Sequence, residues 1–175
     1  EAALLDAIET GRLHHAWLLT GPKGVGKATL AWRAARYLLA RPPAGQDALF
    51  DVPPAASGLE VEPEHPVARR IAAMSEPGLL PIRRPWDADK KRFKTQITVD
   101  EVRKLNSFFG LSATDGGSRV VIIDSADEMN SSAGNQNIRD FRITMCTPQP
   151  VPFADVMHYR IGNVVFFGRG YIGVR

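Results

Sequence analysis

The chain has 175 residues, 44% of them apolar, with 22 Lys and Arg against 19 Asp and Glu and a single cysteine. One cysteine excludes an internal disulfide and a four-thiolate metal site, so we expect a reducing, cytoplasmic location. The net charge of +3 does not by itself argue for nucleic-acid binding, and the absence of a run of about 18 apolar residues argues against a membrane partner. Because the sequence starts at Glu1 without a Met, we expect a fragment.

The first forty residues predict a helix, a strand, a glycine loop and a second helix. Apolar residues at helical spacing across residues 4–8 precede Gly11, a residue suited to ending a helix. Residues 16–20 are a short apolar run typical of a buried strand, and residues 21–27 contain three glycines. From Lys27 onward, apolar residues repeat at every fourth position on neighbouring rows, which predicts an amphipathic helix.

The middle of the chain is rich in proline. Eight of the 13 prolines lie between residues 41 and 81, which predicts an irregular connection over residues 41–78 with one short helix at residues 67–74. Residues 79–82 are a predicted strand, and Pro81 places that strand at a sheet edge or makes it the end of a strand, because proline lacks the N–H group that a ladder needs.

The pattern becomes regular again beyond residue 97. Residues 99–109 are a predicted helix, because Thr98 and Glu101 have the spacing of a capping box and apolar residues lie on one face. A turn at residues 115–118 precedes residues 120–123, a β-branched run typical of a central parallel strand buried on both faces. This strand ends at Asp124.

The composition changes abruptly after residue 130. Residues 1–130 contain 14 Leu, whereas residues 131–175 contain no Leu, Lys, Glu or Trp. We therefore expect a nucleotide-binding-type domain over residues 1–133 and a divergent tail over residues 134–175. The tail is either β-rich, with strands at residues 164–167 and 171–174, or the product of a shifted reading frame.

Residues 21–28 match the phosphate-binding pattern G-x-x-x-x-G-K-[ST] at every fixed position except the last, between a predicted strand and a predicted helix. Backbone N–H groups and the positive end of the helix would hold phosphate oxygens, while the Lys27 ammonium reaches the β- and γ-phosphates. The alternative is a glycine turn without a ligand. We assign no catalytic or metal-binding residue, and the candidate cofactor-binding residues are Gly21, Gly24, Val25, Gly26, Lys27, Ala28, Thr29 and Asp124.

Two residues bear on the use of magnesium. Ala28 stands where the motif has the hydroxyl that binds this ion, and Thr29 is turned about 100° away on the helix. Asp124 would hold the water shell of the ion, unless Asp124 and Asp127 serve only as caps of the next element. We therefore expect weak ATP binding with little dependence on magnesium.

Three segments resemble, in this order, the delta-prime family of bacterial DNA polymerase III clamp-loader subunits, which belongs to the AAA+ class. They are HAWLLTGPKGVGK (residues 15–27), ITVDEVR (residues 97–103) and VIIDSADEMN (residues 121–130). Ala28 combined with Ser125 is similar to the alphaproteobacterial members. The resemblance implies an α/β fold, a RecA-like AAA+ P-loop domain with a parallel sheet, here incomplete at its C-terminal side.

The same resemblance implies a structural subunit of the clamp loader that takes part in loading the sliding clamp onto primed DNA during replication. The implied partners are the gamma/tau and delta subunits, and through the complex the sliding clamp and primed DNA. The implied ATPase activity is weak or absent, since hydrolytic members have Glu at the position of Ser125 and Glu128 lies a turn away. The alternatives are an ATP-hydrolysing subunit of the gamma/tau type or another AAA+ ATPase, and the non-functional product of a broken reading frame.

The chain departs from the family in three ways. Residues 41–100 contain no cysteine, which excludes the four-cysteine zinc module of many relatives. Only Ala133 and Asn135 keep the family register after residue 130, so no arginine finger is assigned. Three of the five expected strands occur before residue 131, so we expect an aggregation-prone chain unless residues 164–167 and 171–174 pair with the edge of the strand that ends at Asp124.

Basic and aromatic residues alternate in residues 83–94. They would either follow a phosphate backbone and stack a base or form a solvated loop, which we favour because Asp87 and Asp89 dilute the positive charge. His14 and His15 are adjacent on an extended segment, so their side chains point in opposite directions and a structural role is expected instead of metal binding.

Overall fold

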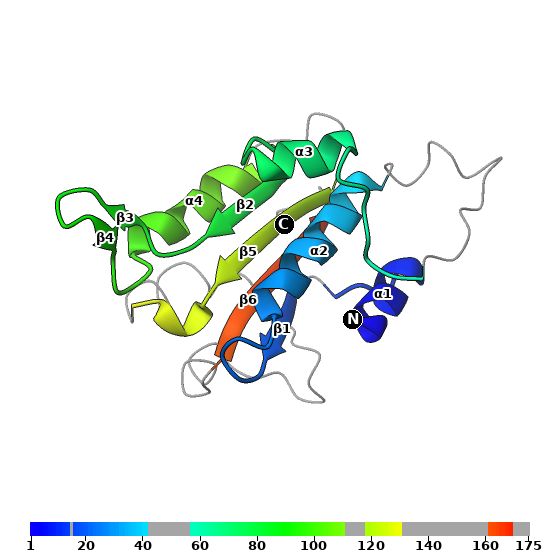
Figure 1. Ribbon diagram of the computed structural model, residues 1–175, viewed down its shortest axis with the longest axis horizontal. Helices are drawn as coiled ribbons and strands as arrows, with labels where there is room; N and C mark the ends of the chain where they lie inside the picture. Colours follow the sequence, from blue (N-terminus) through cyan, green and yellow to red (C-terminus); the bar gives the residue numbers. More distant parts are fainter. Residues whose placement is uncertain (15, 42–56, 111–117, 131–160, 170–175) are drawn as a thin grey trace.

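The computed structural model describes residues 1–14, 16–41, 57–110, 118–130 and 161–169, the last range by its backbone. The predictions for His15, Ala133, Asn135, the lone Cys146 and a strand at residues 171–174 lie outside these ranges. Figure 1 shows the elements, which are α1 (Ala2–Glu9), β1 (Ala16–Thr20), α2 (Lys27–Ala40), α3 (Pro66–Ala72), β2 (Leu79–Ile82), β3 (Trp86–Asp87), β4 (Arg92–Phe93), α4 (Val99–Gly110), β5 (Ser118–Asp124), the 3₁₀ turn η1 (Ala126–Glu128) and β6 (Ile161–Arg169).

The four predicted helices and the first three predicted strands are confirmed, with ends shifted by at most a few residues. Gly11 follows α1 with a φ of 68°, the left-handed conformation that glycine adopts at low cost. At the start of α3, Pro66 occupies the first turn and His65 Nδ1 accepts a hydrogen bond from the Val67 N–H at 3.3 Å. Of the helices described, none is long and apolar enough to cross a bilayer.

The main sheet has the strand order β1-β6-β5-β2. β6 is antiparallel to both β1 and β5, and β2 is parallel to β5, so β1, β5 and β2 run in one direction. The prediction of a parallel sheet is therefore right for these three strands, whereas β6 makes the sheet mixed. β2 lies at the edge, which is one of the two positions that Pro81 indicated. Of the two possibilities stated for the β5 edge, pairing is observed for residues 163–169, which include the predicted strand at residues 164–167.

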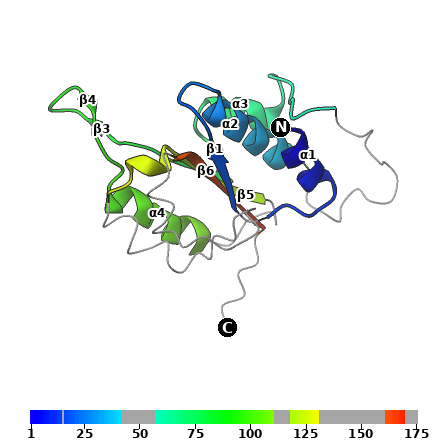
Figure 2. The same cartoon turned by 90° about the horizontal axis from the view of Figure 1, so that it is seen from below.

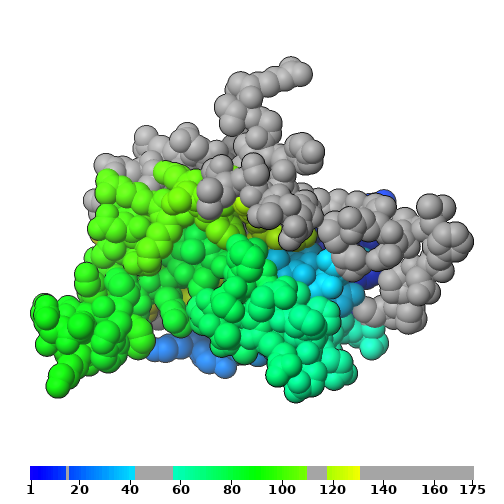
Figure 3. Space-filling model, turned by 90° about the horizontal axis from the view of Figure 1, so that it is seen from above, coloured from blue at the N-terminus to red at the C-terminus, as the bar shows by residue number. Residues whose placement is uncertain are grey.

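Residues 86–93 form a two-stranded antiparallel hairpin in which Trp86 pairs with Phe93 and Asp87 with Arg92. The segment is therefore a hairpin and not an irregular loop, whereas its solvated character is confirmed, because five of its six basic residues are exposed. Asp87 Oδ1 accepts a hydrogen bond from the Lys90 N–H at 3.1 Å, and Lys91 has a φ of 48°, so a side-chain contact and a left-handed residue make a turn that composition did not reveal. The hairpin projects from one end of the molecule (Figures 2 and 3).

Helices cover both faces of the sheet, with α4 on one face and α1, α2 and α3 on the other (Figure 2). Successive residues of β5 point to opposite faces, so Val120 and Ile122 pack with α2 while Val121 and Ile123 pack on the side of α4. All four are fully buried, as expected for a strand covered on both sides.

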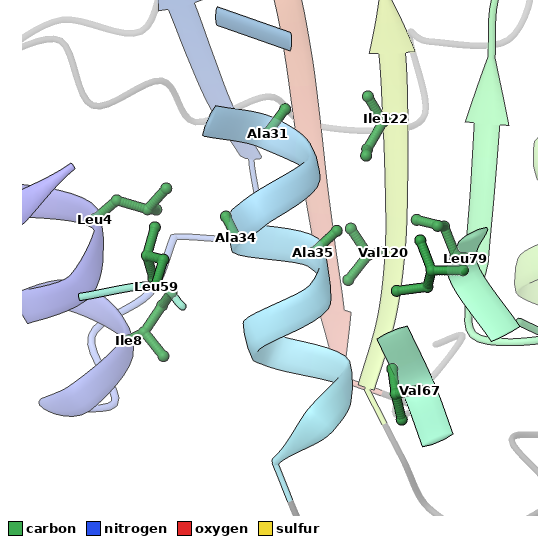
Figure 4. Packing of buried hydrophobic residues seen from close by; sticks show 11 residues of the cluster. Leu4, Ile8, Ala31, Ala34, Ala35, Leu59, Val67, Leu79, Val120 and Ile122 are labelled. Atoms are coloured by element: carbon green, nitrogen blue, oxygen red, sulfur yellow. The ribbon is translucent and has the colours of Figure 1, made fainter. Parts of the chain in front are cut away.

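Three alanines of α2 set the distance between this helix and its neighbours. Ala31, Ala34 and Ala35 are fully buried and lie between β5 and α1 (Figure 4). Small side chains let a helix approach a sheet closely, and this helix begins directly after the glycine loop. The packing of α2 therefore fixes the position of the loop relative to β5.

Candidate functional site

The glycine loop and Asp124 lie at the same edge of the sheet. β1 and β5 run in the same direction, and both end at this edge before the loop and before η1, respectively. Leu19 and Asp124 both pair with Asn163 of β6, so two strand spacings of about 4.8 Å, roughly 10 Å in total, separate their backbones. The two halves of the predicted site thus face one region.

The loop conformation depends on its glycines. Gly21, Gly24 and Gly26 have φ values of 144°, 87° and 93°, which residues with a side chain rarely adopt. A Cβ built on Gly24 or Gly26 would meet no atom within 4 Å, so the requirement for glycine here comes from the backbone and not from crowding. The backbone on that side is open to close approach by a ligand, and Val25 is largely exposed.

The start of α2 provides hydrogen-bond donors. Gly26 is the N-cap, and its carbonyl accepts the first helical hydrogen bond from Leu30 N at 2.9 Å. The N–H groups of Lys27, Ala28 and Thr29 therefore lie in the first turn, where a helix offers them no partner of its own. Together with the helix dipole they form an arrangement that suits the oxygens of a phosphate.

The Lys27 ammonium folds back over the loop. Its Nζ donates hydrogen bonds to the carbonyl oxygens of Gly21 at 2.9 Å and of Pro22 at 2.8 Å. In this conformation the lysine holds the two ends of the loop together. Contact with β- and γ-phosphates, as the motif predicts, would replace these two carbonyl partners.

The first turn of α2 fits a phosphate better than it fits a magnesium ion. Ala28 is half-buried and offers a methyl group where the motif offers a hydroxyl, and the exposed Thr29 lies one helical step further on. The donor set on the loop side is therefore suited to an anion and includes no side-chain oxygen at position 28.

Asp124 is half-buried at the end of β5, and Ser125 after it has a φ of 68°. Ser125 is the N-cap of η1, and its carbonyl accepts a hydrogen bond from Glu128 N at 2.9 Å. The alternative in which Asp124 and Asp127 cap the next element is therefore wrong, because Asp124 precedes the cap and Asp127 lies inside η1. A serine with positive φ stores backbone strain at the point where the strand meets the site.

Glu128 is part of this edge through an ion pair that the sequence did not predict. Its Oε2 lies 2.8 Å from Arg84 Nε. Burial raises the pKa of Glu128, Arg84 opposes that shift, Asp127 and Asp124 add to it, and Lys23 of the loop lowers the pKa. The field at Glu128 thus combines charges from the loop, from η1 and from the segment after β2.

The Arg84–Glu128 ion pair could have been inferred from the sequence together with the parallel pairing of β2 and β5. β2 is parallel to β5 with Ile82 opposite Ile123, so Arg84 and Glu128 both follow strands that end at one edge. The Ile97 N–H also donates to the Glu128 carbonyl at 2.8 Å, which ties η1 to the segment before α4. Knowledge of the parallel pairing would have identified Arg84, whereas composition alone did not.

Comparison with known proteins gives two kinds of match. The family model described as DNA polymerase III, delta subunit, matches residues 2–138. The DNA polymerase III subunit delta' of Pseudomonas aeruginosa is 34% identical over 121 residues, which cover 69% of this chain and 31% of that protein. The DNA polymerase III subunit gamma of Buchnera aphidicola is 47% identical over 36 residues, which cover 21% of this chain and 10% of that protein. The chain thus spans about a third of the length of the delta' relative.

Proposed function

Since the chain belongs to the DNA polymerase III delta-subunit family and is of the delta-prime type, we propose that it is a structural subunit of the clamp loader. In this role it takes part in loading the sliding clamp onto primed DNA during replication. Its partners are the gamma/tau and delta subunits. In the assembled clamp loader, the chain provides a rigid surface for contacts with the neighbouring subunits. Other subunits supply most of the ATP hydrolysis.

The observation that carries this proposal is a phosphate loop of intact backbone geometry without the hydroxyl that the motif places on magnesium. Three glycines with positive φ, a helix start and Lys27 support retention of the anion cradle. Ala28 and Ser125 lack the oxygen and the carboxylate on which hydrolysis depends in this class. ATP binding without hydrolysis is consistent with a subunit that has a structural role.

The residues that we propose to contact a nucleotide are those of the loop and the first turn of α2. ATP when bound supplies the triphosphate charge, and the chain answers it with backbone N–H groups from residues 24–29 and with the Lys27 ammonium. Asp124 lies across the edge from the loop, where a hydrated cation would be the partner of its carboxylate.

We disfavour the product of a broken reading frame because residues 161–169 pair with both β1 and β5. We would not expect a segment without a structural role to form hydrogen-bonded ladders with two strands of the preceding domain. Sequencing the gene across the codon for Gly134 tests this point directly. An alternative frame that encodes a Leu-rich continuation would overturn our preference.

The test of the nucleotide site is ATP binding by calorimetry with magnesium and with EDTA. We expect weak binding that changes less than about threefold between the two conditions, and loss of binding in Lys27→Ala. Ala28→Ser is the matched variant, in which restoring the hydroxyl should increase affinity only when magnesium is present. A gain of about tenfold with magnesium in the unchanged chain would show that another group completes the coordination.

The test of the structural role is co-purification with the gamma/tau and delta subunits of the same organism, together with steady-state ATP turnover of the isolated chain. We expect the chain to enter the complex and to show turnover at background level. Turnover above background that Lys27→Ala abolishes would favour the active ATPase. Failure to enter the complex, with a folded chain, would contradict the clamp-loader role.

A further inference from the structure

Residues 83–94, which we call the basic hairpin, are rich in Lys and Arg. Figure 3 shows this part of the chain at one end of the molecule. The strands β3 and β4 lie within it, and Figure 1 shows them beyond the end of the main sheet. Its charged residues are the cations Arg83, Arg84, Lys90, Lys91, Arg92 and Lys94 and the anions Asp87 and Asp89. The cations outnumber the anions three to one.

Most of these cations face solvent without a carboxylate partner. Arg84 pairs with Glu128, but across the described ranges no ion pair involves the other five cations, all of which are exposed. Asp87, one of the two anions, accepts the hydrogen bond of the Lys90 N–H at 3.1 Å. The positive charge of the hairpin is therefore available to an external anion.

Two aromatic rings lie among these cations. Trp86 and Phe93 face each other across the strand pair with ring centroids 5.1 Å apart and ring planes at 80°, and they are 56% and 51% exposed. Neither ring belongs to the two buried clusters of the core. An edge-to-face pair leaves ring faces uncovered, so the hairpin exposes a large apolar surface that the fold does not use.

From this juxtaposition we propose that the basic hairpin binds single-stranded nucleic acid. Lys and Arg contact phosphates along the strand, and unpaired bases stack on Trp86 and Phe93, the two interactions by which such strands are held without sequence preference. An acidic protein surface would also satisfy the charges, but two exposed rings interleaved with unpaired cations provide both the stacking and the phosphate contacts that a single strand uses. The exposed rings therefore favour nucleic acid.

The hairpin is organised before any ligand arrives. The Lys94 N–H donates to the Pro85 carbonyl at 2.9 Å, the turn is held by Asp87, and Arg84 anchors the base of the hairpin to Glu128. A preformed binding surface loses little conformational entropy on association. The rings and the five unpaired cations are not residues of the glycine loop, and the proposal needs neither nucleotide binding nor entry into a clamp loader.

The experiment is fluorescence anisotropy of labelled oligo(dT) and oligo(rU) with the full chain over a series of salt concentrations. We expect Trp86→Ala to weaken binding by about fivefold or more, because stacking is lost. The triple variant Lys90→Gln, Lys91→Gln, Arg92→Gln should reduce the slope of log K against log salt by about 2. Comparison of the two oligonucleotides shows whether the strand is DNA, RNA or either.

The matched control removes three exposed cations elsewhere, Arg69→Gln, Arg103→Gln and Lys104→Gln on α3 and α4. We expect this variant to keep the salt slope within about 0.5 of the unchanged chain. Equal losses in the control and in the hairpin variant would overturn the proposal, as would no binding at low salt. Binding of a poly-Glu peptide that Trp86→Ala leaves unchanged, without binding of either oligonucleotide, would identify an acidic protein as the partner instead. Circular dichroism melts confirm that each variant is folded.

Discussion

The two strands that flank β5 differ in direction and in whether they lie within the family match. β2 comes from the part of the chain that matches the family, runs parallel to β5 and lies at the edge of the sheet. β6 comes from beyond that match, runs antiparallel and lies between β5 and β1. A long apolar strand such as β5 needs hydrogen-bonding partners on both sides, and the direction of those partners is less restricted than their presence.

This difference shows that the sheet requires a hydrogen-bonding partner on each side of β5, whereas the site requires a fixed spacing between the ends of β1 and β5. The loop after β1 and Asp124 after β5 keep their relation because both strands pair with β6. β6 thus acts as a spacer between the two halves of the site. Four changes, from the largest expected effect to the smallest, test how strictly each flanking strand is needed.

The largest effect is expected from ending the chain after Asn130. This truncation removes β6, so β1 and β5 lose the strand that joins them and expose unpaired N–H and C=O groups. We expect an aggregated product without a cooperative melt, as measured by light scattering and circular dichroism. Ending the chain after Arg169 is the control and should leave the melt intact. A monomeric, cooperatively melting short form would show that β6 is dispensable.

A proline placed in each flanking strand separates the central position from the edge. Val165 pairs with both Trp17 and Ile122, so Val165→Pro removes a ladder donor from the middle of the sheet and should cost about 2 kcal/mol or more. Pro81 already occupies the edge strand, and Pro81→Val should change stability by less than about 1 kcal/mol. Urea unfolding of both variants measures the contrast, and similar costs would contradict the strand order.

The approach of β2 to β5 is close at Gly78. A Cβ at this position would lie 2.8 Å from Leu39 Cδ2 and 3.0 Å from the Ser118 carbonyl oxygen. The leucine can move, but the Val120 N–H donates a hydrogen bond to the Gly78 carbonyl oxygen at 2.8 Å, so the two backbones cannot separate freely. We expect Gly78→Ala to lower the free energy of unfolding by about 1 to 2 kcal/mol. An unchanged urea midpoint would show that the contact between Gly78 and β5 has room for a methyl group.

The smallest effect concerns the ion pair at the ends of β2 and β5. Because burial raises the pKa of Glu128 above its ordinary value of 4.5, the folded chain binds this proton more tightly than the unfolded chain. The stability contributed by Glu128 therefore falls as the pH rises from 4.5 through the folded pKa. Glu128→Gln lacks this titration, so its stability relative to the unchanged chain should increase over that range in urea melts. A difference independent of pH would contradict the raised pKa.

The spacing of apolar residues and the positions of the glycines predicted most of the helices, strands and turns. The rows of apolar residues in α2, the β-branched run in β5 and the glycine loop each follow from neighbours in the sequence. Pro81 indicated either a sheet edge or the end of a strand, because proline lacks the N–H group that a ladder needs, and the edge position is the one observed. The start of α2 at Lys27 follows from the same local signals.

Contacts between distant segments could not be predicted in this way. The position of β6 depends on pairing with strands far away in the chain, and a short apolar run does not encode its direction. The Arg84–Glu128 pair and the Trp86–Phe93 contact depend on strand register, which the sequence fixes only through the whole fold. The hydrogen bonds of Lys27 to Gly21 and Pro22 belong to one conformation of a flexible side chain, which a motif does not specify.

The central place of β6 also sets the order of events in folding. Ala16 pairs with Phe166, so the ladder of β1 forms only after a segment about 150 residues further along the chain is available. Contacts of such long range slow folding, because loop closure must precede the gain from pairing. During synthesis, β1, α2 and β5 are all made before residues 161–169, so β1 and β5 lack their shared neighbour until that segment is made. We therefore expect the growing chain to expose unpaired strand edges, which favour aggregation, until residues 161–169 have left the ribosome.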